Sequence, residues 1–304
     1  MVSRSQISLA AVRRRIRRIS VSRRTINGPD LWTEFASDAG GHIHTSTLNI
    51  AWMARHGVAN TQFRFEDILE FWYSKLIPMN DGMVYDIGAH RGRHTGVFAQ
   101  FGRPVVAFEP NPFIREILDA NAVAWPLTTV RSEAVCNAEG TGTFTVNTSA
   151  PEESGIKRRL YNDEASAQVV EIPVQFAKLD NLHVEAEAIS FIKIDTEGGE
   201  IDIIRGARST LCNYQPVISI EYGFAGYSSY GHVASTLLDL VEEMDYIAYD
   251  IFGFRVDRSN WVQVIDAFCW DFILVPREQV HVHAAISSLR LALAGTIRKY
   301  VIGQ

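Results

Sequence analysis

Residues 84–92 (VYDIGAHRG) form the feature that most restricts the fold of this chain. An apolar run ends in Asp86, two glycines flank a short turn, and a helical pattern follows, as expected where a buried strand opens onto a ligand. A second apolar run, 105–108, ends in Glu109 about 20 residues later, and carboxylates in that position hold ribose hydroxyls in nucleotide-binding α/β sheets. The two runs predict a nucleoside-type ligand at the carboxyl edge of a parallel sheet.

The spacing of the glycines further restricts which nucleoside-type ligand can bind. Gly88 and Gly92 are separated by three residues, whereas a dinucleotide-binding turn has the pattern G-x-G-x-x-G to seat a diphosphate on a helix N-terminus. Asp86 would repel a phosphate but attract a cation such as the α-ammonium of a methionine group. The residues therefore favour S-adenosyl-L-methionine over NAD. An NAD-dependent sugar oxidoreductase or epimerase and a non-catalytic Rossmann-like docking scaffold are the alternatives.

Beyond residue 83, apolar runs of strand length alternate with helical patterns. Strands that alternate with helices predict an α/β fold with a mostly parallel sheet and helices on both faces. The predicted strands are 83–88, 105–109, 128–135, 189–195, 216–222, 246–252 and 267–275. The predicted helices between them are 94–101, 113–124, 200–211 and 232–244.

Additions are expected at both ends of this sheet domain, which we place at 81–277. Residues 26–80 are rich in aromatics and predict a helical cap, which packs on the core or also contributes to a substrate pocket. Its clearest helix, 64–76, carries one apolar stripe: Phe65, Ile68, Leu69, Trp72 and Leu76. Residues 278–304 predict a C-terminal helix that docks on the body or mediates a homodimer.

An insert, residues 140–180, interrupts the alternation between the third and fourth strands. Residues 143–146 and 172–176 predict an antiparallel pair of strands. The polar loop between them, 151–168, has the length of a functional loop, and we expect it to act as a mobile lid.

Composition restricts the class of protein and its partners. Of 304 residues, 47% are hydrophobic and 21% are charged, which suits one large α/β domain with appendages. The three cysteines form no C-x-x-C pair, so we expect no metal cluster, no disulfide framework and a cytoplasmic location. No apolar run approaches the length of a membrane span. The net charge of −6 argues against a nucleic-acid partner.

Charge is unevenly distributed, because the first 29 residues contain eight arginines and no acid. In the basic tail, 1–25, one helical face carries Leu9, Val12, Ile16 and Ile19. That pattern fits peripheral contact with an anionic membrane, and it also fits a mitochondrial transit peptide. A frayed, disordered tail is the third interpretation, because arginines four residues apart repel each other.

Several motifs in order resemble one known family. They are 86–92 (DIGAHRG), 108–112 (FEPNP), 179–180 (LD), 192–200 (IKIDTEGGE), 205–207 (RGA) and 216–221 (PVISIE). Together they resemble the FkbM family of S-adenosylmethionine-dependent methyltransferases, over about residues 83–222. The resemblance implies a class I methyltransferase (Rossmann-like) fold with a seven-stranded sheet. It also implies O-methylation of a sugar, glycolipid or natural-product acceptor. His90 departs from the family pattern, which more often has Asn there.

Candidate site residues follow from the carboxyl ends of the strands, where open α/β sheets bind ligands. For the cofactor they are Asp86, Gly88, Ala89, His90, Gly92, Thr95, Glu109, Asn111, Glu133, Ala134 and Asp195. For catalysis they are Asp195, Glu197, Lys193, His94 and Glu221.

Asp195 is the favoured catalytic base. A hydroxyl is a weak nucleophile, and a positioned base is worth about 10²–10⁴-fold in rate. Lys193 precedes Asp195 by two residues on the same strand face and would orient it. The competing interpretation is that Asp195 or Thr196 caps the following helix. No metal is predicted, although Asp195, Glu197 and Glu200 with a histidine would suit a divalent ion.

Overall fold

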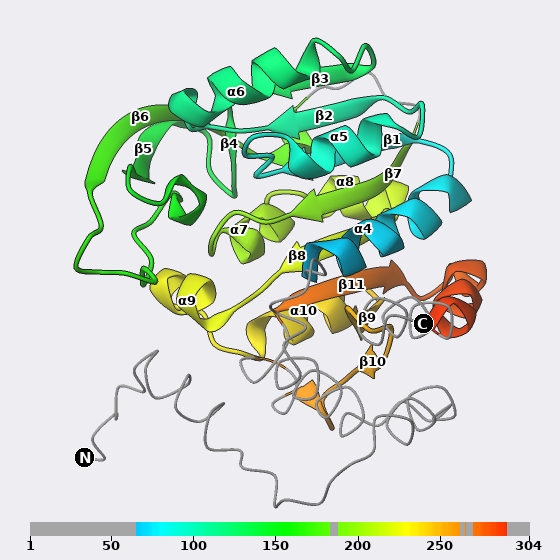
Figure 1. Ribbon diagram of the computed structural model, residues 1–304. Coiled ribbons are helices and arrows are strands. Elements are labelled where there is room, and N and C mark those ends of the chain that lie inside the picture. Colours follow the sequence, from blue (N-terminus) through cyan, green and yellow to red (C-terminus); the bar gives the residue numbers. More distant parts are fainter. Residues whose placement is uncertain (1–64, 183–187, 262–264, 266–269, 291–304) are drawn as a thin grey trace, which may run out of the picture.

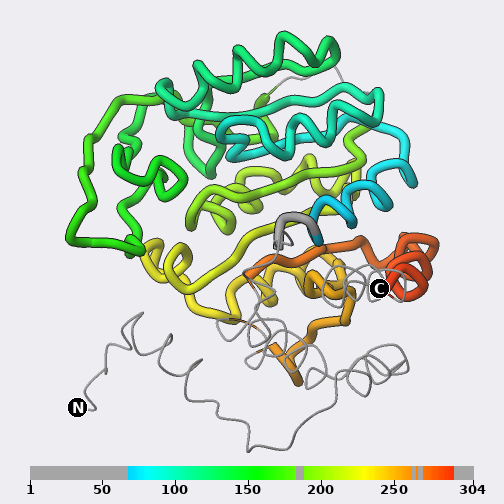
Figure 2. The backbone as a smooth tube through the Cα atoms, viewed as in Figure 1, coloured from blue at the N-terminus to red at the C-terminus, as the bar shows by residue number. Residues whose placement is uncertain are grey.

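The computed structural model describes residues 65–182, 188–261, 265 and 270–290 (Figures 1 and 2). An eight-stranded sheet in the order β10-β9-β11-β8-β7-β1-β2-β3 forms its centre. The expected basic tail, 1–25, and most of the expected cap, 26–64, lie outside the described residues.

Five neighbouring strands of this sheet run parallel. They are β1 (Met83–Ile87), β2 (Val105–Phe108), β3 (Thr128–Arg131), β7 (Ile189–Ile194) and β8 (Val217–Glu221). β2 and β7 are buried along their whole length, as expected for strands covered on both faces. β11 (Asp271–Pro276) runs antiparallel to both β8 and β9 (Tyr246–Asp250). The predicted mostly parallel sheet is therefore confirmed.

The sheet has one strand more than the predicted seven. The addition is β10 (Arg255–Val256), which pairs antiparallel with β9 at the edge. The chain reverses between them at Gly253, whose φ of +83° favours glycine. Two-residue strands carry too little sequence pattern to be predicted.

Helices lie on both faces of the sheet in Figure 1, with α4 and α5 over the near face and α8 and α10 over the far face. Their bounds are α5 (Arg93–Ala99), α6 (Pro112–Ala122), α7 (Glu200–Arg205), α8 (Arg208–Tyr214), α9 (Phe224–Tyr227) and α10 (Thr236–Glu243). The single helix predicted at 200–211 is two helices, α7 and α8, with a break at Gly206. A Cβ there would lie 2.2 Å from the carbonyl oxygen of Cys136, so the chain passes too close for a side chain.

The helix expected at 64–76 is α4 (Phe65–Leu76). Its apolar stripe packs on the core, with Ile68, Leu69, Trp72 and Leu76 all buried. Trp72 Nε1 donates a hydrogen bond of 2.6 Å to the carbonyl oxygen of Ile251, which fixes α4 near the β9–β10 turn. Burial of each such side chain contributes about 1.5–3 kcal/mol to the free energy of folding, so these contacts hold the helix on the sheet.

The insert forms a second sheet of three strands, in the order β4-β6-β5. β5 (Gly140–Asn147) and β6 (Val169–Ala177) are the predicted antiparallel pair. β4 (Ala134–Val135) pairs with β6, so the strand predicted at 128–135 is divided between two sheets.

The polar segment between β5 and β6 contacts both β5 and the main domain. It begins with the turn η3 (Pro151–Glu153), and Gly155 pairs with Thr145 of β5. The backbone N–H of Lys157 donates to the hydroxyl of Tyr230 at 3.1 Å. We refer to residues 151–168 as the cover segment.

The C-terminal end of the described chain is helical from 280 to 290. Ile286 of this helix is buried and Leu289 packs against the core, so the described part of the predicted C-terminal helix docks on the body. Across the described ranges, no helix combines the length and apolarity needed to cross a membrane.

Candidate active site

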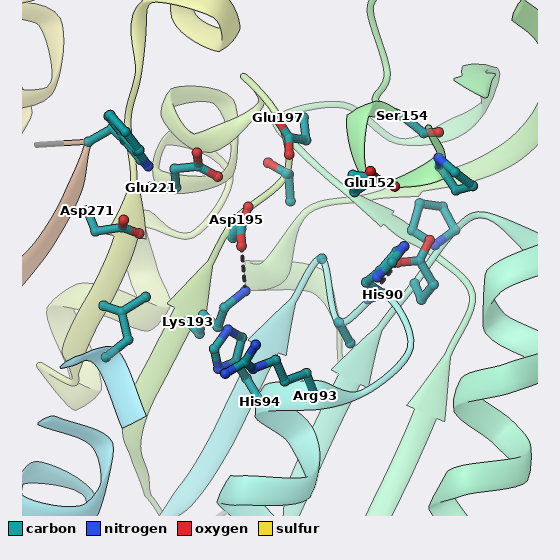
Figure 3. Close-up of a pocket in the computed structure, with 18 of the residues that line it drawn as sticks. His90, Arg93, His94, Glu152, Ser154, Lys193, Asp195, Glu197, Glu221 and Asp271 are labelled. Atoms are coloured by element: carbon teal, nitrogen blue, oxygen red, sulfur yellow. Dashed lines mark hydrogen bonds and ion pairs between the residues drawn. The ribbon is translucent and has the colours of Figure 1, made fainter. Parts of the chain in front are cut away.

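A cavity of about 380 Å³ opens at the carboxyl ends of β1, β2, β7 and β8 (Figure 3). Its size is typical of small-molecule sites, and open α/β sheets bind ligands at this edge. Six carboxylates line it: Glu109, Glu152, Asp195, Glu197, Glu221 and Asp271. The cationic side chains among its described lining residues are Arg93 and Lys193. The cavity is therefore acidic and favours a positively charged ligand.

Glu109 follows β2 and forms one wall of this cavity. Its Oε2 accepts the backbone N–H of His90 and its Oε1 accepts that of Asn111, each at 2.8 Å. Each oxygen keeps a second lone pair, so the carboxylate can still accept hydrogen bonds from ligand hydroxyls. Burial raises the pKa of Glu109 to about 7, although the two amides act in the opposite direction.

The turn between β1 and α5 has most of its backbone amides bound within the protein. Gly88 and Ala89 both donate to the carbonyl oxygen of Phe108 at 3.0 Å, and Gly92 donates to that of Ala89 at 2.8 Å. The amide of His90 is bound to Glu109. These amides form no free cradle for a diphosphate, in agreement with the missing G-x-G-x-x-G pattern.

The glycines of the turn serve contacts inside the protein. A Cβ on Gly88, whose φ is +82°, would lie 1.8 Å from the carbonyl oxygen of Asp195. A Cβ on Gly92, whose φ is +87°, would lie 3.0 Å from the ring of Trp125. Protein neighbours thus require glycine at both positions. Gly88 and Ala89 nevertheless line the cavity.

Asp86 and Thr95, both expected at the cofactor, lie beneath the cavity. Both are fully buried, and neither is among its lining residues. Thr95 Oγ1 donates to Asp86 Oδ2 at 2.6 Å, and Lys193 Nζ lies 3.8 Å from Asp86 Oδ1. Burial raises the pKa of Asp86, against the effects of Lys193 and Thr95. Asp86 therefore faces a cation of the protein.

Lys193 on β7 extends its ammonium to Asp195, as predicted (Figure 3). Nζ lies 3.0 Å from Asp195 Oδ2, and the side chains are 4% and 32% exposed, respectively. Burial disfavours both charges, but the ion pair outweighs it: the pKa of Asp195 is lowered and that of Lys193 is raised. Asp195 is thus held ionised at the cavity surface.

The helix after β7 is not capped by Asp195 or Thr196. The N-cap of α7 is Gly199, without a side-chain cap. Glu200 instead turns back and accepts the backbone N–H groups of Thr196 and Gly198 at 3.0 Å each. The capping interpretation is therefore wrong, and the Asp195 carboxylate is available to the cavity.

Glu221, at the end of β8, shares a hydrogen bond with Asp195. Burial raises the pKa of Glu221 well above its usual value, and the negative charges of Asp195 and Asp271 add to the effect. Glu221 consequently holds the proton of this hydrogen bond. Asp271 begins β11 directly opposite Glu221 and also lines the cavity.

Both candidate histidines line the cavity as neutral rings. Burial lowers the pKa of His94 to about 3 and also lowers that of His90. The His94 ring meets the edge of Tyr73 at a centroid distance of 5.4 Å. His94 Nδ1 and His90 Nε2 are buried and find no hydrogen-bond partner among the described residues. They are the polar atoms of the cavity most in need of a ligand.

Glu197 is bound to the cover segment. It forms an ion pair with Arg159, and the two side chains are 18% and 13% exposed, respectively. Its backbone has a φ of +63°, in the left-handed region. The predicted catalytic residue Glu197 thus joins the insert to the end of β7 while still lining the cavity.

Three predicted cofactor residues lie at the margin of the site. Glu133 and Ala134 line a smaller adjoining pocket, together with Phe108 and Pro110. Asn111 is buried, and its Oδ1 caps α6 by accepting the N–H of Phe113 at 3.2 Å, a bond at the long end of the usual range. Asn111 therefore positions the Glu109 loop.

Leu69 of α4 lines the cavity, in agreement with the interpretation that the cap contributes to a pocket. Sequence reasoning missed several other lining residues: Arg93, Phe144, Glu152, Ser154, Trp270 and Asp271. Most of these belong to the insert and the start of β11. Asp271 begins β11 beside Glu221, the last residue of β8, whereas the predicted strand, 267–275, placed it within the strand and gave no signal for the site.

The acids at this edge also offer oxygen ligands. Asp195, Glu197 and Glu221 each have an oxygen within 4.8 Å of the others. Glu200, part of the metal set considered from the sequence, is turned to backbone amides. Glu197 and Asp195 already have cationic partners, so the cluster is explained by the protein itself.

Comparisons with known proteins identify the family. The sequence model of the methyltransferase FkbM domain matches residues 86–248. No curated protein matches the chain. A solved FkbM methyltransferase from Methylobacillus flagellatus KT has 18% identity and a TM-score of 0.43, and the match covers 81% of this chain and 56% of that one. The chain thus spans little more than half of that relative.

A second solved structure, magnesium protoporphyrin IX methyltransferase from Synechocystis PCC 6803 with bound SAM, has 10% identity and a TM-score of 0.39. That match covers 83% of this chain and 92% of the other. The family model matches more than half of the present chain, in the region that builds the cavity. The chain belongs to the FkbM family of methyltransferases.

Proposed function

We propose that this methyltransferase uses S-adenosyl-L-methionine to methylate a hydroxyl of a sugar, glycolipid or natural-product acceptor. The observation that carries the proposal is one acidic cavity that contains both Glu109 and the ion-paired Asp195. Glu109 follows β2, whereas Asp195 follows β7 and Glu221 ends β8, both on the other side of β1. The cavity thereby offers separate positions for a nucleoside and an acceptor.

The β1–β2 side suits a sulfonium nucleoside. Glu109 retains lone pairs for ribose hydroxyls, and the adjoining pocket presents the apolar surfaces of Phe108, Pro110 and Ala134 to a base. The excess of carboxylates in the cavity compensates the positive charges of the sulfonium and the ammonium. When bound, S-adenosyl-L-methionine supplies an electrophilic methyl group.

Asp195 is suited to orient the acceptor and to receive its proton. Lys193 keeps the carboxylate ionised, so it can accept a hydrogen bond from the acceptor O–H. As the oxygen–methyl bond forms and the sulfur–methyl bond breaks, the O–H proton becomes strongly acidic. Even a carboxylate of low pKa then accepts it. Glu221, which keeps its own proton, holds Asp195 from the other side.

The first experiment is calorimetric titration with S-adenosylhomocysteine and, separately, NAD. We expect S-adenosylhomocysteine to bind and NAD not to bind, because the turn amides are occupied. Binding of NAD alone would favour the oxidoreductase alternative, and binding of neither would favour the scaffold.

The second experiment is transfer from methyl-labelled S-adenosyl-L-methionine to glycan and lipid extracts. An O-methyl ether survives alkali, whereas a methyl ester is hydrolysed. Asp195→Asn should retain S-adenosylhomocysteine binding and lose about 10²–10⁴-fold in turnover. Glu171→Gln, on the exposed side of β6, is the control and should behave as the wild type. Full turnover in Asp195→Asn would remove Asp195 from the mechanism.

A further inference from the structure

Asp86, the buried acid of β1, faces β7, which carries Lys193 and is followed by Asp195; we refer to β7 as the catalytic strand. Asp86 and Lys193 are paired in register on the adjacent parallel strands β1 and β7. We propose that Asp86 is a positioning residue that, together with Thr95, holds the Lys193 ammonium against Asp195 and does not itself bind the cofactor. The inference rests on the proposed function, in which Asp195 receives the acceptor proton.

The hydrogen bonds of Asp86 support this assignment. Its Oδ2 is occupied by the Thr95 hydroxyl at 2.6 Å. Its Oδ1 is buried, has no hydrogen-bond partner among the described residues, and lies 3.8 Å from Lys193 Nζ. Asp86 is also fully buried and is not among the residues that line the cavity, so its carboxylate is directed to Lys193 and not to the cavity above.

The surroundings of Lys193 explain why a second acid is needed. Lys193 has one acid on each side, since Asp195 Oδ2 lies 3.0 Å from Nζ and Asp86 lies below. On β8 its register partner is Ser219, whose hydroxyl pairs with that of Tyr73 at 3.1 Å. A buried ammonium with a single, partly exposed partner could swing into the cavity. Asp86 gives it a fixed position beneath Asp195.

Thr95 completes the arrangement from α5. It lies in the first turn of that helix and is fully buried. Its hydroxyl fixes the rotation of the Asp86 carboxylate, so that the other oxygen points to Lys193. The order of contact is therefore Thr95, Asp86, Lys193 and Asp195, and only the last two reach the cavity.

The test uses two near-isosteric variants, Asp86→Asn and Thr95→Val, with circular dichroism to verify folding. The first readout is the rate at which acetic anhydride modifies Lys193, followed by mass spectrometry with exposed Lys75 as internal reference. Loss of the Asp86 charge should lower the pKa of Lys193 and release its amine, so we expect at least about a tenfold faster reaction. Thr95→Val should produce a smaller increase in the same direction.

The second readout is the calorimetric Kd of S-adenosylhomocysteine. We expect Asp86→Asn to stay within about threefold of the wild type, whereas Glu109→Gln, which alters a cavity wall, should weaken binding about tenfold. If Asp86→Asn weakens binding more than this, the same substitution is made in a Lys193→Met background. That double variant shows whether Asp86 acts through Lys193 or contacts the nucleoside directly. No further weakening there would show that Asp86 acts through Lys193 and would support the proposal.

Two results would overturn it. One is an unchanged Lys193 reaction rate in both Asp86→Asn and Thr95→Val. The other is weakened binding in Asp86→Asn that persists undiminished in the Lys193→Met background, which would mean direct contact with the nucleoside. Failure of the wild-type protein to bind S-adenosylhomocysteine would reject the proposed function, whereas the lysine reaction would still test the position of Asp86.

Discussion

Arg159 of the cover segment forms an ion pair with Glu197 at the end of the catalytic strand. Arg159 lies between β5 and β6 of the small sheet, whereas Glu197 lies in the loop that follows β7 of the large sheet. Pro151, Glu152 and Ser154 of the same segment line the cavity. The pair therefore fixes one wall of the site to the strand that carries Lys193 and Asp195.

Arg159→Ala should destabilise the protein and loosen the cover segment. The Arg159 side chain is 13% exposed, and its loss leaves a partly buried carboxylate on Glu197 without its partner, at a cost of about 1–3 kcal/mol. Urea unfolding and limited proteolysis within residues 151–168 measure the two effects. The control is Arg158→Ala, whose pair with Glu164 is 59% and 47% exposed and worth about 0–1 kcal/mol. Equal effects of the two variants would contradict the prediction.

The affinity for S-adenosylhomocysteine should rise with pH through the titration of Glu109. The pKa of Glu109 is raised to about 7, so the ionised form, which accepts hydroxyl hydrogen bonds more strongly, becomes the major form only above about pH 7. Between about pH 6 and 8 we expect roughly a tenfold gain in affinity. Glu109→Gln should bind weakly at both pH values. A wild-type affinity independent of pH would show that the ribose hydroxyls are held elsewhere.

His94 should contribute to loss of stability in acid. Its folded-state pKa is lowered to about 3 from 6.5, so the unfolded chain binds a proton that the folded protein does not. The contribution is complete above pH 6.5 and is lost as the pH falls toward 3, by a few kcal/mol in total. Urea unfolding at pH 7 and pH 5 should show a smaller loss in His94→Gln than in the wild type. Parallel losses in both proteins would mean that carboxylates alone cause the acid effect.

Gly88→Ala should be strongly destabilising. The variant combines a left-handed backbone, about 1–2 kcal/mol, with a Cβ placed 1.8 Å from the Asp195 carbonyl oxygen, and we expect a total of at least about 3 kcal/mol. The matched control is Gly102→Ala, because φ is +65° there but no atom lies within 4 Å of the added Cβ. Gly102→Ala should cost only the backbone term. If both cost the same, the contact between β1 and β7 is more compliant than the structure indicates.

Much of the fold and part of the site could be predicted from sequence because their causes are local. Apolar periodicity identifies strands and helices, and a carboxylate after a strand, such as Glu109 or Asp195, must lie at the carboxyl edge of the sheet. Lys193 and Asp195 are two residues apart on one strand, so their pairing was also predictable.

The remaining features depend on which distant segments meet. Asp86 was expected at the ligand, but its register with Lys193 places it beneath the cavity. Glu197 was expected to be a catalytic residue, and in the structure it forms an ion pair with Arg159 of the insert. No sequence pattern records such partners, because the pairing of separate strands and the docking of a long segment are decided by packing.

The sequence by itself determined three things: the order of strands and helices along the chain, the family, and the carboxylates at the ends of the strands. Only the tertiary structure decided which of those carboxylates face the cavity and which are neutralised inside the protein. The physical reason is that a buried charge needs a partner within a few ångströms, and in this protein the partners of Asp86 and Glu197 come from other elements of the fold.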